Sequence, residues 1–360
     1  MWSDYIDPGL RDEALSMVDD DRGYTWLTWR GRRLEVADVH QPGDTDSCGR
    51  HRQLLRSGAR SDYSYDETLP PSYGDPGARV SWLDAAGVDE AVCFPNFGLL
   101  WERRLSSSVP ALTANMQAWN RYCGVVRDQS GGRLHPVAHL TLRDPAWLVG
   151  QLAALAASGI RLAMIAPSPV DGRALSHPHH ETIWSAFVDH GITPVFHVAD
   201  QPRVFDDCWY ADDADFVPVV ESVFLWVPPA LALTDLILGG VFDRHPALRV
   251  GVVELSSIWV PQFLLMLDGA FDFTGRLNGR TSELAMRPSQ YILDRVRVSS
   301  FSYEDPRRLT AKTGDVFMCC SDYPHSEGTA SPVADYERIG CDPETAPGLF
   351  VDNVRFLLGV

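Results

Sequence analysis

The sequence predicts an α/β fold, a (β/α)8 TIM-type barrel with an incomplete or atypical first strand. From about residue 79 onward, short apolar runs alternate with amphipathic stretches, which is the pattern of strand–helix units around a parallel sheet. The runs are almost continuously apolar, as expected for parallel strands that are covered on both faces. A chain of 360 residues is long enough for one such barrel.

The expected strands are short apolar runs spread from residue 90 to residue 321. They are residues 90–95 (EAVCFP), 134–142 (LHPVAHLTL), 160–167 (IRLAMIAP), 193–199 (TPVFHVA), 248–255 (LRVGVVEL), 295–300 (RVRVSS) and 315–321 (DVFMCCS). Helices are expected between them, among them residues 81–87, 144–159 and 180–191, each of which ends on a glycine as helices often do. Because this is one strand short of a closed barrel, the eighth must come from the N-terminal quarter, or the barrel is incomplete.

The N-terminal segment, residues 1–78, differs in composition from the barrel region, residues 79–360. Residues 40–79 are rich in Gly, Pro, Ser and Asp, which predicts a long polar loop or lid. We expect the two regions to form one domain. A second long segment, residues 199–238, carries aromatic residues among aspartates and is expected to be an insertion after a strand. These aromatics could line a pocket, although packing is the commoner reason for them.

Composition excludes several classes of function. The net charge of −17 is spread without a basic patch, so nucleic acid is not an expected partner. No apolar run reaches the roughly 18 residues of a membrane span. The first residues are acidic and polar, unlike a secretory signal, so a cytoplasmic protein is expected. The 7 cysteines form no CxxC pairs, which argues against a disulfide framework and a cysteine zinc site.

Ionisable residues stand at the ends of three predicted strands. His197 lies late in one strand, Glu254 ends another, and Asp322 and His325 follow the last. In a parallel barrel these ends meet on the catalytic face. An isolated histidine there is most often a core residue, but with Asp322 it supplies two of the about three ligands that a catalytic Zn²⁺ site needs. A metal of this kind lowers the pKa of bound water towards about 7.

The chain resembles the amidohydrolase superfamily, in particular the branch that contains aminocarboxymuconate semialdehyde decarboxylase. The matching stretches are SWLDAAGVDEAVCFPN, GITPVFH, LILGGVFDRHPALRVGVVELSSIWVPQFLLMLD, CSDYPHSEG and the closing DN. The resemblance implies a metal-dependent (β/α)8 barrel with one divalent metal, for which Zn²⁺ is expected. It matches His197 to the histidine ligand of the fifth strand and Asp322 to the aspartate of the eighth, and it implies a dimer.

Two departures from the family pattern matter. Glu254 stands in the stretch where the decarboxylases usually carry a catalytic histidine, and it could orient substrate, move protons, or form a structural salt bridge. The HxH or acidic-x-His pair of the first strand is not where the family has it. Three explanations remain open: a misplaced start removed the strand, the protein lost it and depends on a partner, or residues 35–41 (EVADVHQ), with Asp38 and His40, form the first strand.

Two other features could indicate a metal site, but their sequence context argues against it. His177, His179 and His180 lie after the fourth strand, where the proline between them and a helix start predict a loop and a helical turn rather than ligands. The sole lysine, Lys312, lies far from the fourth strand, so a binuclear site bridged by a carboxylated lysine is not expected and a single metal is.

We therefore expect a metal-dependent hydrolase or decarboxylase that acts on a small carboxylated or amide-bearing compound, aromatic compounds included. In this scheme His197 and Asp322 bind the metal, Asp322 also activates its water, and Glu254 and His325 assist. The alternative is a catalytically impaired barrel subunit that works with a paralogous partner. A metal-independent enzyme that uses Asp322 and Glu254 as acid and base is a third reading. Homodimers and paralogue heterodimers are the expected assemblies.

Overall fold

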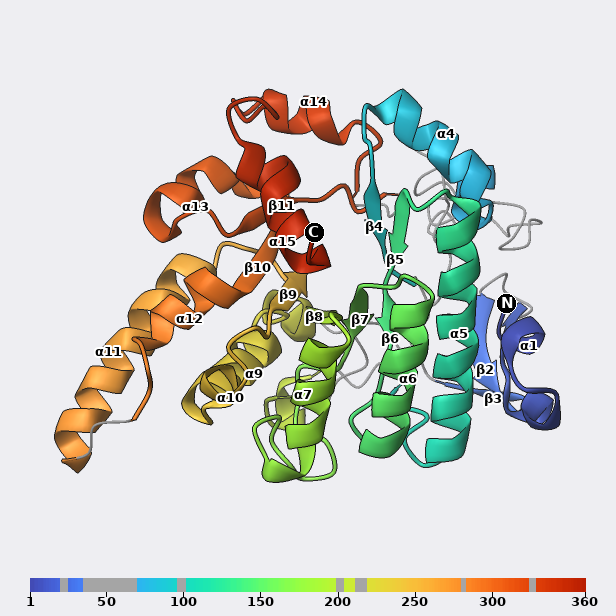
Figure 1. Cartoon of the computed structure of the whole chain (residues 1–360), viewed down its shortest axis with the longest axis horizontal. Helices are drawn as coiled ribbons and strands as arrows, with labels where there is room; N and C mark the ends of the chain where they lie inside the picture. The colour runs from blue at the N-terminus through green and yellow to red at the C-terminus, as the bar shows by residue number, and fades with distance from the viewer. Residues whose placement is uncertain are drawn as a thin grey trace.

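Parallel strands in chain order form the frame of the molecule (Figure 1). The computed structural model describes residues 1–19, 25–34, 70–95, 102–198, 204–210, 219–279, 283–323 and 328–360. Within these ranges the strands of the frame are β4 (Ala91–Cys93), β5 (Leu134–Pro136), β6 (Ala138–His139), β7 (Leu162–Met164), β8 (Thr193–His197), β9 (Val250–Val253), β10 (Val296–Ser300) and β11 (Phe317–Cys319). Every predicted strand is found, each shorter than its apolar run.

Each neighbouring pair in this frame is parallel. β4 pairs with β5, and the pairing from β6 to β11 follows chain order without a crossover. Only Val137 separates β5 from β6, and its N–H donates to the Cys93 carbonyl at 2.9 Å, so β5 and β6 act as one barrel strand. The predicted α/β fold, with parallel strands that follow one another in chain order, is thereby confirmed.

Helices return the chain from each strand to the next and cover the outside of the frame (Figure 1). Those of the barrel region are α3 (Pro71–Gly74), α4 (Pro76–Ala86), α5 (Val109–Gln129), α6 (Pro145–Ala157), α7 (Glu181–Asp189), α8 (Val219–Val223), α9 (Val227–Leu238), α10 (Val241–Arg244), α11 (Val260–Asn278), α12 (Pro288–Arg295), α13 (Pro306–Thr313), α14 (Pro332–Glu337) and α15 (Asn353–Leu358). Short helical turns are η4 (Pro178–His180), η5 (Asp207–Trp209), η6 (Ser302–Glu304) and η7 (Gly348–Asp352).

Side chains alternate between two buried layers along the strands. Ala163 and Phe196 belong to the larger cluster, which also contains Trp184 and Phe187 of α7. Met164, Val195 and other residues of opposite parity form a second cluster with Leu357 of α15. The helix α15 approaches so closely that a Cβ on Gly251 would lie 3.1 Å from Leu357 Cδ1. The side chains of this second cluster point to the inside of the frame, because those of the larger cluster face the outer helices. His197 has the same parity as Val195 and therefore also points inward, at the carboxyl end of β8.

Within the described residues, the frame ends at β11 on one side and at β4 on the other. Among the described residues, no strand pairs with the outer edge of β11 or of β4. Side chains make one contact between the two sides: Tyr323, just after β11, stacks on Trp82 of α4 with ring centroids 3.9 Å apart. The Ser72 and Tyr323 hydroxyls are also 3.2 Å apart. Residues 35–69, with Asp38 and His40, lie outside the described ranges, so the proposed first strand stays a prediction.

The first residues form a small unit that the sequence did not reveal. It consists of α1 (Trp2–Tyr5), η1 (Pro8–Glu13) and an antiparallel sheet of β1 (Leu15–Asp19), β2 (Thr25–Trp29) and β3 (Arg32–Arg33). This unit packs on α5, where Asn115 accepts from the Leu15 N–H at 2.8 Å and donates to the Glu13 carbonyl at 2.7 Å. The N-terminal segment therefore shares a buried cluster with a barrel helix.

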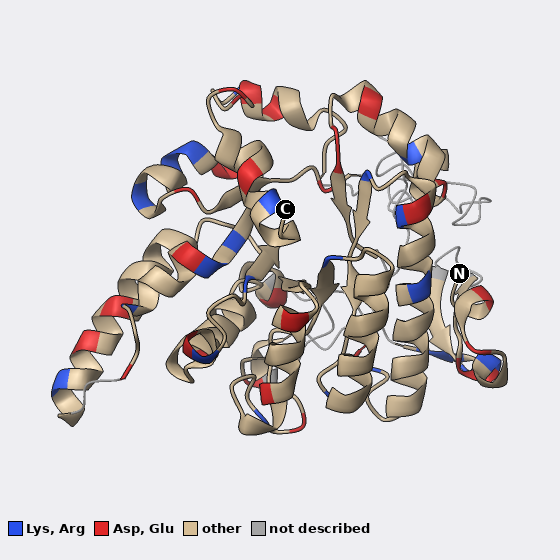
Figure 2. Cartoon of the chain, in the orientation of Figure 1, with Lys and Arg blue, Asp and Glu red and all other residues tan. Residues whose placement is uncertain are grey.

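Charged residues of both signs are interspersed over the helices that the structure describes (Figure 2). None of these helices combines the length and the apolar character that crossing a membrane requires.

Candidate functional site

The carboxyl ends of β8 and β9 bring a histidine and a glutamate into contact. His197 is the last residue of β8 and pairs in register with Val253, so Glu254 follows directly beside it. The Nε2 atom of His197 lies 2.9 Å from Oε2 of Glu254. The histidine side chain is 1% exposed and that of the glutamate 22%, so solvent reaches the pair from the glutamate side. The sequence placed both residues at strand ends, and the structure joins them.

The imidazole of His197 is held in a defined orientation. Its Nδ1 lies 2.9 Å from the Val198 carbonyl oxygen, and because a carbonyl can only accept, Nδ1 carries the proton. The Phe94 ring packs against it, with centroids 4.3 Å apart. Fixing one ring nitrogen in this way leaves Nε2 as the atom that meets a carboxylate, a proton or a metal ion.

The backbone at Glu254 adopts a conformation that non-glycine residues rarely take. Its φ is +56°, and that of Ser256 is +61°, both in the left-handed region. The Glu254 N–H donates to Ser299 Oγ at 2.9 Å, which ties the turn to β10. Left-handed conformations cost on the order of 1 kcal/mol or more in non-glycine residues and cluster at functional sites. The strained turn is therefore a second indication that this strand end is functional.

A buried carboxylate anchors the same turn. Both oxygens of Glu304, in η6, accept hydrogen bonds: Oε1 from Ser256 Oγ at 2.6 Å and from the Ser257 N–H at 3.1 Å, and Oε2 from Ser257 Oγ and the Phe301 N–H, each at 2.9 Å. The side chain thus ties the loop after β9 to the loop after β10. Sequence reasoning missed Glu304, although a glutamate shortly after a predicted strand end was a visible signal.

Asp322 comes just after β11, at the same end of the frame. It too has a left-handed backbone, with φ +51°, and its Oδ2 atom is buried. His325 lies outside the described residues, so its assisting role stays a prediction. Within the described ranges, no three or more His, Cys, Asp or Glu side chains are grouped so that they could hold a metal ion. The roles of His197 and Asp322 as metal ligands therefore remain expectations from the sequence.

The cysteines beside Asp322 are structural. Burial raises the pKa of the Cys319 thiol to about 12 and that of Cys320 well above its usual value, so neither provides a thiolate nucleophile. The hydroxyl of Tyr336, fully buried, accepts from the Cys320 N–H at 2.9 Å and donates to the Ser300 carbonyl. This bridge fixes the ends of β10 and β11 to each other.

The cluster of three histidines after β7 has the structural role that its sequence context predicted. His177 is exposed, and its Nδ1 accepts from the His179 N–H at 3.1 Å. His180 is buried, donates from Nδ1 to the Ala174 carbonyl at 3.0 Å, and has its pKa lowered by that burial. His179 and His180 belong to η4, and His177 is the N-cap residue that precedes it.

A second buried His–Glu pair was missed because His139 lies inside an apolar run. His139 Nε2 is 3.6 Å from Glu102 Oε2, and both side chains are almost fully buried. Asn120 of α5 holds the strand at this point, since it accepts from the His139 N–H at 2.8 Å and donates to the His139 carbonyl at 3.2 Å. The pair ties the region after β4 to β6.

Comparison with known proteins identifies the fold. No protein-family model matches the chain. No curated protein matches it. Among solved structures, an amidohydrolase from Mycobacterium avium subsp. paratuberculosis K-10 matches over 100% of this chain and 94% of its own, with a TM-score of 0.76 and 22% identity.

Two decarboxylases of aromatic acids share the same fold. 5-Carboxyvanillate decarboxylase from Novosphingobium aromaticivorans, solved with manganese and 4-hydroxy-3-methoxy-5-nitrobenzoic acid, matches over 88% of this chain and 93% of its own, with a TM-score of 0.64 and 19% identity. 2,6-Dihydroxybenzoate decarboxylase from Rhizobium matches over 85% and 94%, with a TM-score of 0.57 and 15% identity. The chain therefore has the fold shared by these amidohydrolase and decarboxylase structures, as the resemblance in its sequence predicted.

Proposed function

We propose that this chain is a metal-dependent enzyme of amidohydrolase type, either a hydrolase or a decarboxylase, that acts on a small carboxylated or amide-bearing aromatic compound. The observation that carries the proposal is the His197–Glu254 pair, 2.9 Å apart on a strained turn at the carboxyl ends of adjacent barrel strands. Solved structures with this fold include an amidohydrolase and decarboxylases of aromatic carboxylates, which supports the reaction class.

Two side chains at this end of the frame are of the kinds that bind a divalent metal. The fixed Nδ1 proton of His197 leaves Nε2 for a metal, and Asp322 offers a carboxylate from the same end of the frame. A bound divalent ion would supply Lewis acidity to a substrate oxygen and lower the pKa of a water molecule. We propose Zn²⁺ as the resident ion, with the manganese of the solved decarboxylase as the second ion to test.

The remaining groups would position the substrate and move protons. The carboxylate of Glu254, partly exposed beside the buried His197, is placed to accept a proton or to orient a polar substrate group. In the proposal His325, beyond the described ranges, assists from the segment after Asp322. Since a glutamate stands where a decarboxylase would carry a histidine, hydrolysis is the reaction we test first.

The test measures metal content and activity on the same preparations. Purified protein should contain about one divalent ion per chain, and the metal-loaded form should hydrolyse amides of aromatic acids or release CO₂ from hydroxybenzoates. His197→Ala and Asp322→Asn should lose both metal and turnover, with stability followed by thermal unfolding. An Asp322→Asn variant that keeps full activity, together with wild-type protein that binds no metal, would refute the scheme.

The alternative is a catalytically impaired subunit that needs a paralogous partner. It is favoured by the lack, within the described ranges, of a group of three side chains that could hold a metal. Light scattering on the purified chain, alone and mixed with an intact paralogue from the same genome, distinguishes the two assemblies. We propose a homodimer in the cytoplasm; a chain that binds metal and turns over substrate only in the mixture would support the alternative.

A further inference from the structure

We propose that Glu254 is itself a ligand of the metal and shares the ion with His197. This inference rests on the proposed function, because it assumes that a divalent ion occupies the carboxyl ends of the strands. It differs from the acid–base role considered above, in which Glu254 contacts substrate but not metal.

The distance between the two donor atoms supports a shared ion. Ligand atoms of tetrahedral Zn²⁺ lie about 2.0–2.2 Å from the metal, so two of them are about 3.4 Å apart. Nε2 of His197 and Oε2 of Glu254 are 2.9 Å apart. Both atoms can therefore reach one ion if they move apart by about half an ångström.

Hydrogen bonds orient the His197 ring and fix the backbone of Glu254 before any ion binds. The Nδ1 proton of His197 is directed to the Val198 carbonyl, so the lone pair of Nε2 points to the glutamate side. The backbone of Glu254 is fixed through its N–H by Ser299, and the loop that follows it is fixed by Glu304. Support of this kind orients metal ligands and raises affinity.

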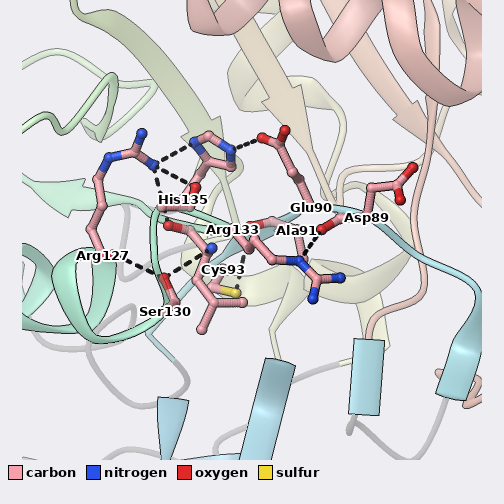
Figure 3. Close-up of polar contacts among 10 residues, drawn as sticks. Asp89, Glu90, Ala91, Cys93, Arg127, Ser130, Arg133 and His135 are labelled. Carbon is pink, nitrogen blue, oxygen red and sulfur yellow. Dashed lines mark hydrogen bonds and ion pairs between the residues drawn. The ribbon is translucent and has the colours of Figure 1, made fainter. Parts of the chain in front are cut away.

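A His–Glu pair at the opposite end of the strands lacks these properties and provides a matched control (Figure 3). Glu90 precedes β4, and its carboxylate contacts His135 Nε2. The guanidinium of Arg127 donates to His135 Nδ1 at 3.0 Å, so Nδ1 accepts and Nε2 carries the proton that Glu90 receives. With the proton on Nε2 and a cation beside the ring, this pair is not suited to a metal.

The experiment compares metal binding by Glu254→Gln, Glu254→Ala, His197→Ala and the control Glu90→Gln. Metal-free protein is titrated with Mn²⁺ and with Zn²⁺ by isothermal calorimetry, and the Co²⁺ form is followed by its visible absorption. Loss of a residue that merely supports a ligand weakens metal binding by about 10–100-fold. We therefore expect both Glu254 variants to weaken binding by at least about 100-fold and to alter the Co²⁺ spectrum, with Glu90→Gln unchanged.

Three results would overturn the inference, and they separate it from the proposed function. If Glu254→Gln and Glu254→Ala keep the affinity and Co²⁺ spectrum of the wild type while His197→Ala loses both, Glu254 is not a ligand and the metal enzyme stands. If Glu90→Gln weakens binding as much as Glu254→Gln, the effect is not specific to this strand end. If the wild-type protein binds no ion, both proposals fail. Circular dichroism of each variant ensures that folded proteins are compared.

Discussion

Glu304 offers the sharpest test of how the turn at Glu254 is held. Each oxygen of its carboxylate accepts from one backbone N–H, that of Ser257 or that of Phe301, and from one serine hydroxyl. In Glu304→Gln one of these oxygens becomes an NH₂ group, so one backbone N–H faces a donor and cannot rotate away. Leaving a buried N–H without an acceptor costs about 1–3 kcal/mol. The remaining hydrogen bonds would then be made to a neutral amide instead of a carboxylate, which costs about 1 kcal/mol more.

We therefore expect Glu304→Gln to lower the free energy of unfolding by about 2–4 kcal/mol, measured by urea unfolding followed by tryptophan fluorescence. Glu337→Gln, at an exposed position on α14, serves as the control and should change stability by less than about 0.5 kcal/mol. A Glu304→Gln variant as stable as this control would show that the carboxylate does not anchor the two loops, and the preorganisation of Glu254 would need another source.

Three further substitutions test separate parts of the structure. Tyr336→Phe removes the hydroxyl that bridges the ends of β10 and β11 and should cost about 1–3 kcal/mol in urea unfolding; no loss would mean that the bridge is absent in solution. Trp82→Ala removes the stack on Tyr323 and should cost about 1–3 kcal/mol, against little change for the exposed Trp209→Ala; equal effects would show that the stack does not stabilise the fold. Because burial lowers the pKa of His180, its unfolded form binds the proton more readily, so stability should fall as the pH drops below about 6.5. His180→Asn should reduce that slope in unfolding measured from pH 7.5 to pH 5, and an unchanged slope would refute the assignment.

The frame was predictable because most of the buried strands are nearly continuous apolar runs in the sequence. The runs at residues 193–199 and 248–255 became β8 and β9, and their polar ends, His197 and Glu254, lie at the expected edge. Parallel strands place consecutive carboxyl ends together, so the approximate location of the site followed from the pattern alone.

The contacts within the site were not predictable in the same way. That Glu254 meets His197 depends on strand register and on a left-handed turn, and a glutamate in the sequence signals neither. Glu304 acts through hydrogen bonds to backbone groups of another loop, which have no side-chain signature. The small sheet of β1 to β3 was missed because its strands are short and mixed in polarity, and its support comes from packing on α5.

The left-handed backbones of Glu254, Ser256 and Asp322 also bear on how this protein could change over time. Glycine takes that conformation without strain, so replacing any of the three with glycine would relieve on the order of 1 kcal/mol at that position. At Glu254 and Asp322 the same replacement would delete side chains on which the proposed chemistry depends, and at Ser256 it would delete a hydroxyl that holds the turn. Selection for thermal robustness alone would thus tend to erase this end of the barrel, and glycines at these positions in a related chain would mark a protein that has kept the scaffold and given up the reaction.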